Sequence, residues 1–159
     1  MELIHSIAAE NDDIHALIVG GEDPKRKDYA NELYRRVKEL GLSDRVTFTG
    51  ARRDIREIFA ISEIVYSLST KPESFGRTVL EALSLGRPVL GYDHGGVGEI
   101  LAEIYPEGRV RLKCQNSLNE ASRKLMLNAR PPAKSRAFTK SEMLTNTVDV
   151  YRDSISAKS

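Results

Sequence analysis

The sequence is short of the residues and runs on which several classes of protein depend. Its 159 residues include one cysteine, Cys114, so that no disulfide can form within the chain and a cysteine-based metal site is not expected. No apolar run approaches the roughly 20 residues of a membrane-spanning helix, and the first residues lack the basic start and apolar stretch of a signal peptide. The formal net charge of +1 offers no basic surface for nucleic acid. We therefore expect a soluble cytoplasmic protein without a metal or a nucleic-acid partner.

The chain does contain a regular alternation of short apolar runs and amphipathic stretches. Short apolar runs bounded by turn residues predict strands, and they fall at 15–20, 45–49, 64–69, 87–92 and 109–113. Helical spacing of apolar residues predicts helices between these runs, at 23–40, 54–62, 77–85 and 97–105. Strands that alternate with helices over short links predict an α/β fold, a Rossmann-like parallel sheet with helices on both faces.

The N-terminal part of the chain supplies three details of this prediction. A helix over residues 1–9 precedes the first strand. The continuous apolar run at 16–19 predicts a strand that is buried on both sides. Asp23 followed by Pro24 predicts a helix start, because aspartate caps a helix and proline suits its first residue.

The C-terminal part predicts two more helices. Ser117 and Glu120 have the spacing of a capping box, which predicts that a helix begins there. Pro131 and Pro132 then interrupt the chain. The last helix has an apolar stripe that we expect to pack in the core, formed by Leu144, Val148, Tyr151 and Ile155.

Ligands of open parallel sheets bind beyond the carboxyl ends of the strands, and here the segments that follow four strands all contain glycine. These segments are 20–22, 50–53, 70–76 and 93–96. The helix that begins near Gly76 directs its free N–H groups out of this edge, which predicts a phosphate site. Glu73 precedes this helix and Glu81 lies about two turns into it, and carboxylates accept hydrogen bonds from sugar hydroxyls. The spacing alone carries little weight, because Glu2 and Glu10 have it too.

The residues around these two glutamates resemble a known family. Glu73 and Glu81 match the E-x7-E signature of the retaining GT-B glycosyltransferases of the family-4 type. The G-x-P-V and G-G-x-x-E patterns that follow in the family are present at 86–89 and 95–99. The chain is similar to the C-terminal, donor-binding half of these enzymes. The resemblance implies that residues 1–159 are one nucleotide-sugar-binding domain that lacks the N-terminal acceptor lobe and the first strand.

The resemblance also implies roles for single residues. Glu81 would hydrogen-bond the ribose of the nucleotide, and Glu73 would be the catalytic residue next to the donor sugar. The remaining expected donor contacts are Gly20, Gly21, Gly50, Ala51, Arg52, Phe75, Gly76, Arg77, Thr78, Gly95 and Gly96. Among these, the backbone N–H groups of 76–78 would hold the diphosphate or the sugar, and the loop 50–52 would border the base.

The implied reaction moves a sugar from a UDP-, GDP- or ADP-linked donor to an acceptor with retention of configuration, in bacterial polysaccharide or glycolipid synthesis. It needs no metal and no further cofactor. The partners would be the nucleotide sugar and the N-terminal lobe, and peripheral membrane association would come only through that lobe. Two alternatives remain, a non-catalytic module that binds a nucleotide sugar and another GT-B activity such as an epimerase. His94 is interpreted as a residue that fixes the backbone, or as an exposed one, rather than as a catalytic one.

Overall fold

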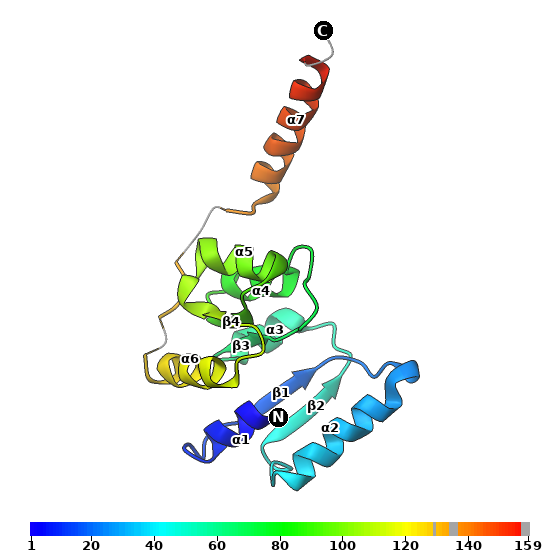
Figure 1. The fold of residues 1–159 in the computed structure, drawn as a ribbon, viewed down its shortest axis with the longest axis vertical. Helices are drawn as coiled ribbons and strands as arrows, with labels where there is room; N and C mark the ends of the chain where they lie inside the picture. The colour runs from blue at the N-terminus through cyan, green and yellow to red at the C-terminus, as the bar shows by residue number, and fades with distance from the viewer. Residues whose placement is uncertain (129, 134–136, 157–159) are drawn as a thin grey trace.

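The computed structural model describes residues 1–128, 130–133 and 137–156 (Figure 1). Its strands are β1 (Ala16–Val19), β2 (Val46–Gly50), β3 (Val65–Ser67), β4 (Val89–Tyr92) and β5 (Arg109–Val110). Its α-helices are α1 (Glu2–Ala8), α2 (Lys27–Glu39), α3 (Ile55–Ile61), α4 (Arg77–Ser84), α5 (Gly95–Ile104), α6 (Gln115–Asn128) and α7 (Lys140–Ser156). Two 3-10 turns, η1 (Pro24–Arg26) and η2 (Pro106–Gly108), complete the order. The alternation predicted from the sequence is confirmed.

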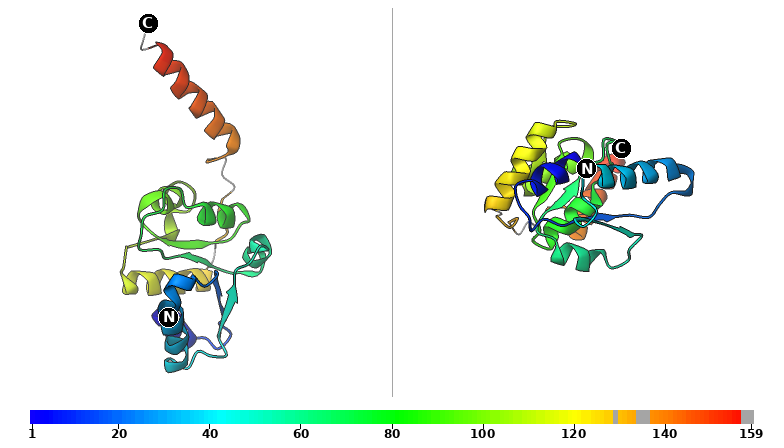
Figure 2. Two further views of the ribbon diagram at one scale, coloured as in Figure 1. Left: turned by 90° about the vertical axis from the view of Figure 1, so that its right-hand side faces the viewer. Right: turned by 90° about the horizontal axis from the view of Figure 1, so that it is seen from below.

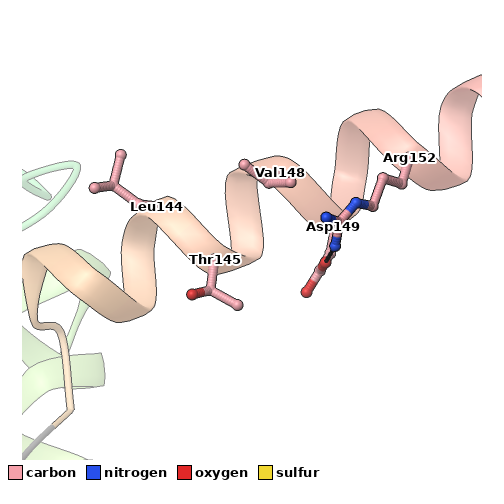
Figure 3. Close-up of a pocket in the computed structure, with 5 residues that line it drawn as sticks. All are labelled: Leu144, Thr145, Val148, Asp149 and Arg152. Atoms are coloured by element: carbon pink, nitrogen blue, oxygen red, sulfur yellow. Dashed lines mark hydrogen bonds and ion pairs between the residues drawn. The ribbon is translucent and has the colours of Figure 1, made fainter.

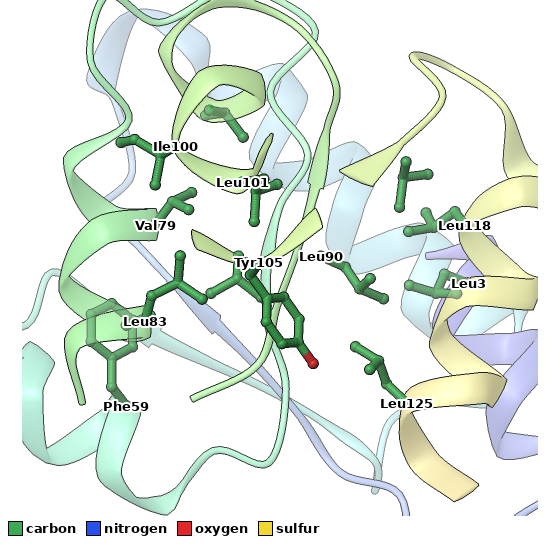
Figure 4. Packing of buried hydrophobic residues seen from close by; sticks show 14 of the residues in the cluster. Leu3, Phe59, Val79, Leu83, Leu90, Ile100, Leu101, Tyr105, Leu118 and Leu125 are labelled. Carbon is green, nitrogen blue, oxygen red and sulfur yellow. The ribbon is translucent and has the colours of Figure 1, made fainter. Parts of the chain in front are cut away.

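All strand pairs are parallel, as expected, but in the described residues the strands form two sheets rather than one. One sheet has the order β1-β2 and the other the order β3-β4-β5. In the second sheet, α4 and α5 pack on β4 on one side, and α6 packs on β4 and β5 on the other. Figure 4 shows this arrangement, with Val79 and Ile100 on one side of Leu90 and Leu118 on the other.

The prediction that β1 is buried on both sides is wrong. The side chains of β1 alternate, and those of Leu17 and Val19 are 37% and 40% exposed. The other face, with Ala16 and Ile18, packs in a small cluster around Val37 that includes residues of α1 and α2. Helices therefore cover one face of this two-stranded sheet more fully than the other.

Helix α1 joins the two sheets. Leu3 and Ile7 lie in the large core cluster of the three-stranded sheet, whereas Ile4 packs against the small cluster of β1 and β2. Ion pairs extend from both ends of the helix, from Glu2 to Arg36 of α2 at 2.6 Å and from Glu10 to Arg123 of α6 at 2.6 Å. Because these contacts bridge two sheets that share no ladder, α1 fixes their relative position.

Several predicted boundaries shift for local reasons. The Asp23 carboxylate accepts a hydrogen bond from the N–H of Lys25 at 2.9 Å, which confirms the cap, although the chain first forms η1. The capping box does not start α6, because the N–H of Leu118 already donates to the carbonyl of Cys114 at 3.1 Å. β5 ends at Val110, and the chain turns through Lys113, which has a φ of 56°.

Helix α7 extends away from the rest of the chain (Figures 1 and 2). None of its residues is buried, since no other described helix or strand covers it sufficiently. The prediction of a core stripe is therefore wrong, and its four residues are between 45% and 70% exposed. The hollow in Figure 3 is lined by side chains of α7 alone, among them Leu144, Val148 and Arg152. Within the described ranges, no helix has the length and hydropathy needed to cross a bilayer.

Candidate functional site

The loop between β3 and α4 packs directly on the first turn of α5. The N–H of Gly96 donates to the carbonyl of Glu73 at 2.9 Å. A Cβ added to Gly96 would lie 2.5 Å from the carbonyl carbon of Phe75, and one added to Gly95 would lie 2.8 Å from the carbonyl oxygen of Glu73. Glycine at both positions therefore permits backbone-to-backbone contact. The loop that carries Glu73 therefore lies directly against the glycine pair 95–96.

Gly76 sets the start of α4. It lies in the left-handed region, with a φ of 76°, and its carbonyl accepts from the N–H groups of Val79 at 3.0 Å and Leu80 at 3.2 Å. The N–H groups of Arg77 and Thr78, in the first turn, have no acceptor within the helix. Partial positive charge therefore collects at this end of α4, where an anion would be stabilised.

The two predicted site carboxylates differ in their surroundings. Glu81 accepts a hydrogen bond from the Nε of Arg77 at 2.7 Å, one helical turn away, and the two side chains are 41% and 84% exposed. Glu73 is exposed in the loop ahead of the helix. Phe75, 48% exposed in the same loop, contacts the ring of Phe138 edge-on with the centroids 6.2 Å apart. The ion pair and the ring contact were not predicted from the sequence.

The loops that follow β1 and β2 form a second group. The N–H of Gly20 donates to the carbonyl of Gly50 at 3.1 Å, and a Cβ added to Gly21 would lie 3.3 Å from the Cβ of Ala51. In Figure 1 the arrowheads of β1 and β2 point to the side on which the loop between β3 and α4 lies. The predicted donor contacts are thus gathered in two groups on one side of the molecule.

Arg52 is engaged within its own loop. Its Nε donates to Asp54 at 2.8 Å, directly before α3. This hydrogen bond holds the pKa of the Asp54 carboxyl below its usual value and raises the pKa of Arg52. The guanidinium is thereby paired with Asp54 next to the loop that follows β2.

Polar contacts around β4 hold the loop between β3 and α4 and the start of α5 in place. The Nε2 of His94 lies 2.9 Å from the carbonyl oxygen of Ser69, which supports its interpretation as a residue that fixes the backbone. Arg109 pairs with Asp93 at 2.6 Å, and the side-chain hydrogen bond raises the pKa of Arg109. The sequence contained no signal for this pair, because Asp93 follows β4 whereas Arg109 begins β5, 16 residues further along the chain.

The described residues contain no group of three His, Cys, Asp or Glu side chains placed to hold a metal ion. The chemistry that the site offers is instead a helix N-terminus for an anion, with two carboxylates beside it and two glycine-lined loops nearby. That arrangement suits a phosphorylated ligand that also carries hydroxyl groups.

Comparison with known proteins identifies structures and sequences that are similar to this chain. The structure of Alr3699/HepE of Anabaena, determined in complex with UDP and glucose, matches with a TM-score of 0.72 and 28% identity over 80% of this chain and 35% of that chain. The C-terminal domain of LpcC, a group 1 family protein of Francisella tularensis, matches with a TM-score of 0.69 and 25% identity over 80% of this chain and 67% of that chain. Mannosylfructose-phosphate synthase of Agrobacterium fabrum is 40% identical over 85 residues, or 51% of this chain and 18% of that protein.

The fold and these relatives define the class, the GT-B glycosyltransferases. Residues 1–141 match the glycosyl transferases group 1, and the chain belongs to that family. It spans less than a fifth of the length of mannosylfructose-phosphate synthase and about a third of the length of Alr3699/HepE.

Proposed function

We propose that this chain is the donor-binding domain of a retaining glycosyltransferase, and that an N-terminal lobe binds the acceptor. The observation that carries the proposal is the open N-terminus of α4 after Gly76, which has Glu73 ahead of it and Glu81 within it. A diphosphate needs N–H donors, and a sugar nucleotide needs acceptors for its hydroxyl groups. The two requirements meet on this one helix.

In this proposal the N–H groups of residues 76–78 hold the diphosphate, and the helix dipole stabilises the charge of the leaving group without a metal or other cofactor. Glu81 accepts hydrogen bonds from the ribose. It must first release Arg77, and an exposed pair of this spacing is worth only about 0.3–0.5 kcal/mol. Arg77 is then free to turn towards the phosphates.

Glu73 receives the role of the residue beside the donor sugar, because the loop that carries it ends at the same helix start. In the proposal, the base of the nucleotide binds next to the loops 20–21 and 50–52, whose glycines allow a ligand to approach the backbone closely. Uridine is the first base to test, since the structure of Alr3699/HepE was determined with UDP. GDP- and ADP-linked donors are the other two classes.

The proposal is tested by titrating UDP and a UDP-sugar into the wild-type chain, Glu81→Gln and Glu73→Gln. A charged hydrogen bond is worth about 1.5–3 kcal/mol, so Glu81→Gln should weaken UDP binding by about ten- to a hundredfold. Glu73→Gln should leave UDP binding nearly unchanged and weaken binding of the UDP-sugar. Glu103→Gln, at an exposed position near the other end of α5, is the matched control. Wild-type affinities in both site variants would refute these roles.

We further propose that the isolated chain binds its donor with a dissociation constant nearer millimolar than micromolar and transfers no sugar. Transfer needs the donor and the acceptor to be held at near-attack distance. This positioning lowers the activation barrier by about 7–11 kcal/mol. The chain as described offers no second lobe to close over the sugar. Robust transfer by these 159 residues at ordinary enzyme concentrations would contradict the proposal.

A further inference from the structure

The segment between α6 and α7 contacts the body of the protein at two described points. The hydroxyl of Tyr105, a buried residue that follows α5, donates to the carbonyl of Arg130 at 3.0 Å. Further along, Phe138 is partly buried and packs against the large core cluster. The hydroxyl of Thr139 then accepts from the N–H of Glu142 at 3.2 Å, as the cap of a helix does. Phe138 therefore docks on the body directly before α7 begins.

The backbone of Phe138 is strained. Its φ of 60° lies in the left-handed region, where the Cβ of a bulky residue crowds the following carbonyl. The other described residue of this kind is Lys113, which lies in an exposed turn after β5. Strain of this sort persists only where the surroundings fix the conformation, and it is concentrated at sites that must be held in place. The docking of the Phe138 side chain provides such a constraint.

The ring of Phe138 meets the ring of Phe75 in the loop between β3 and α4. The two centroids are 6.2 Å apart and the rings are inclined at 77°, which is the edge-to-face arrangement that aromatic pairs favour. Phe75 is 48% exposed, so that its side chain has few neighbours to hold it. The contact with Phe138 therefore makes up a substantial part of what fixes this side chain.

Phe75 lies at a sensitive place in the loop. It stands between Glu73, the predicted sugar contact, and Gly76, from which α4 begins. The backbone of this part of the loop is held from one side by the N–H of Gly96, which donates to the carbonyl of Glu73. The ring of Phe138 holds it through a side chain that comes from a distant part of the sequence. A shift of the Phe75 ring would therefore be transmitted to both ends of the candidate site.

We propose that Phe138 is a positioning residue for the candidate site. Its ring docks on Phe75 and thereby sets the place of the loop 73–76, and with it Glu73 and the free N–H groups at the start of α4. Phe138 acts only through Phe75 and touches no donor. The proposal rests on the proposed function in taking a nucleotide sugar as the ligand, whereas the effect of Phe138 on the loop is present with or without a nucleotide.

The test compares two variants without the ring, Phe138→Ala and Phe138→Gly, with the conservative variant Phe138→Tyr in the full chain. The amide of Gly96 reports on the loop, because it exchanges when its hydrogen bond to the carbonyl of Glu73 opens. Loss of an aromatic pair should speed this exchange by about three- to tenfold in both variants without the ring and weaken UDP binding by a similar factor. Phe138→Tyr should behave as the wild type does.

The two variants without the ring separate positioning from stability. Glycine tolerates a φ of 60°, whereas alanine does not, so Phe138→Gly should unfold at a higher urea concentration than Phe138→Ala. The exchange of the Gly96 amide and the affinity for UDP should nevertheless be alike in the two variants, because both lack the ring. If Phe138 only stabilised the fold, exchange and affinity would instead follow the urea midpoints.

Two controls come from the same chain. Tyr151→Ala removes a ring that is 67% exposed on α7 and should change neither exchange nor affinity. The amide of Gly20, which donates to the carbonyl of Gly50 in the other group of loops, should exchange at the wild-type rate in every variant. Where the variants without the ring do not fold, Phe138→Leu, which keeps an apolar side chain, takes their place in the same measurements.

Four results would overturn the role of Phe138. They are an absent nuclear Overhauser effect between the rings of Phe75 and Phe138 in the wild-type chain, unchanged exchange of the Gly96 amide without the ring, equal acceleration at Gly20, and unchanged affinity in a chain that binds UDP. A wild-type chain that does not bind UDP would count against the proposed function alone. The exchange of the Gly96 amide would then still decide whether Phe138 positions the loop.

Discussion

Gly96→Ala should destabilise the chain, although the same change in a helix usually stabilises it. Alanine is better than glycine by about 0.5–1 kcal/mol inside a helix. At Gly96 the new Cβ would meet three backbone atoms of Phe75, at 2.5 Å, 2.6 Å and 2.7 Å. The closest contact falls about 1 Å short of an ordinary carbon–carbon separation. Because these are backbone atoms, no rotamer change can relieve the clash.

The loop that carries Glu73 must therefore move away from α5, and the hydrogen bond from the N–H of Gly96 to the carbonyl of Glu73 must lengthen. Overpacking of this kind costs about 1–3 kcal/mol, which outweighs the gain in helix propensity. The same movement displaces the proposed diphosphate site at Gly76. A misplacement of about 1 Å is enough to impair such a site severely, so UDP affinity should fall by about tenfold or more.

Urea denaturation measures the first effect, and titration with UDP measures the second. Gly41→Ala is the control, because its φ of 67° makes alanine strained while its Cβ would meet no atom within 4 Å. It should cost about 1–2 kcal/mol through strain alone and leave UDP binding unchanged. If Gly96→Ala unfolds at the wild-type urea concentration or a higher one, the reasoning about the contact is refuted, whatever the result for UDP.

Three further predictions concern acid stability, α7 and metals. Arg123 holds the pKa of Glu10 below its usual value through a side-chain hydrogen bond, so this stabilisation is present above the usual glutamate pKa and is lost as the pH falls through the lowered one. Glu10→Gln should therefore flatten the pH dependence of urea denaturation in the acid range, and a curve identical to that of Glu103→Gln would contradict this. Deletion from Lys140 onwards should change the unfolding free energy by no more than about 0.5 kcal/mol, since no residue of α7 is buried, and a loss above about 2 kcal/mol would show that the helix packs on the body. Affinity for UDP, measured by titration, should be the same with and without EDTA, and a loss that magnesium restores would argue for a metal in the site.

Much of this protein could be predicted from its sequence, because local chemistry decides much of it. Apolar runs and helical spacing located the five strands and the helices α2, α3, α4 and α5 of the described chain to within a few residues, and glycine after the strands marked the loops that carry the candidate site. The spacing of Glu73 and Glu81, with the glycines and the proline that follow them, was enough to indicate the family to which the chain belongs.

The tertiary structure decided what depends on residues far apart in the chain. Only the folded chain shows that Leu17 and Val19 lie on a partly exposed face of their sheet, because an apolar run does not reveal whether a neighbour will cover it. The apolar stripe of α7 was misjudged for the same reason. The pairing of Asp93 with Arg109 and the contact of Phe75 with Phe138 likewise join segments whose meeting no local pattern encodes. Local propensity acts within a few residues, whereas burial and pairing are settled by the packing of the whole chain.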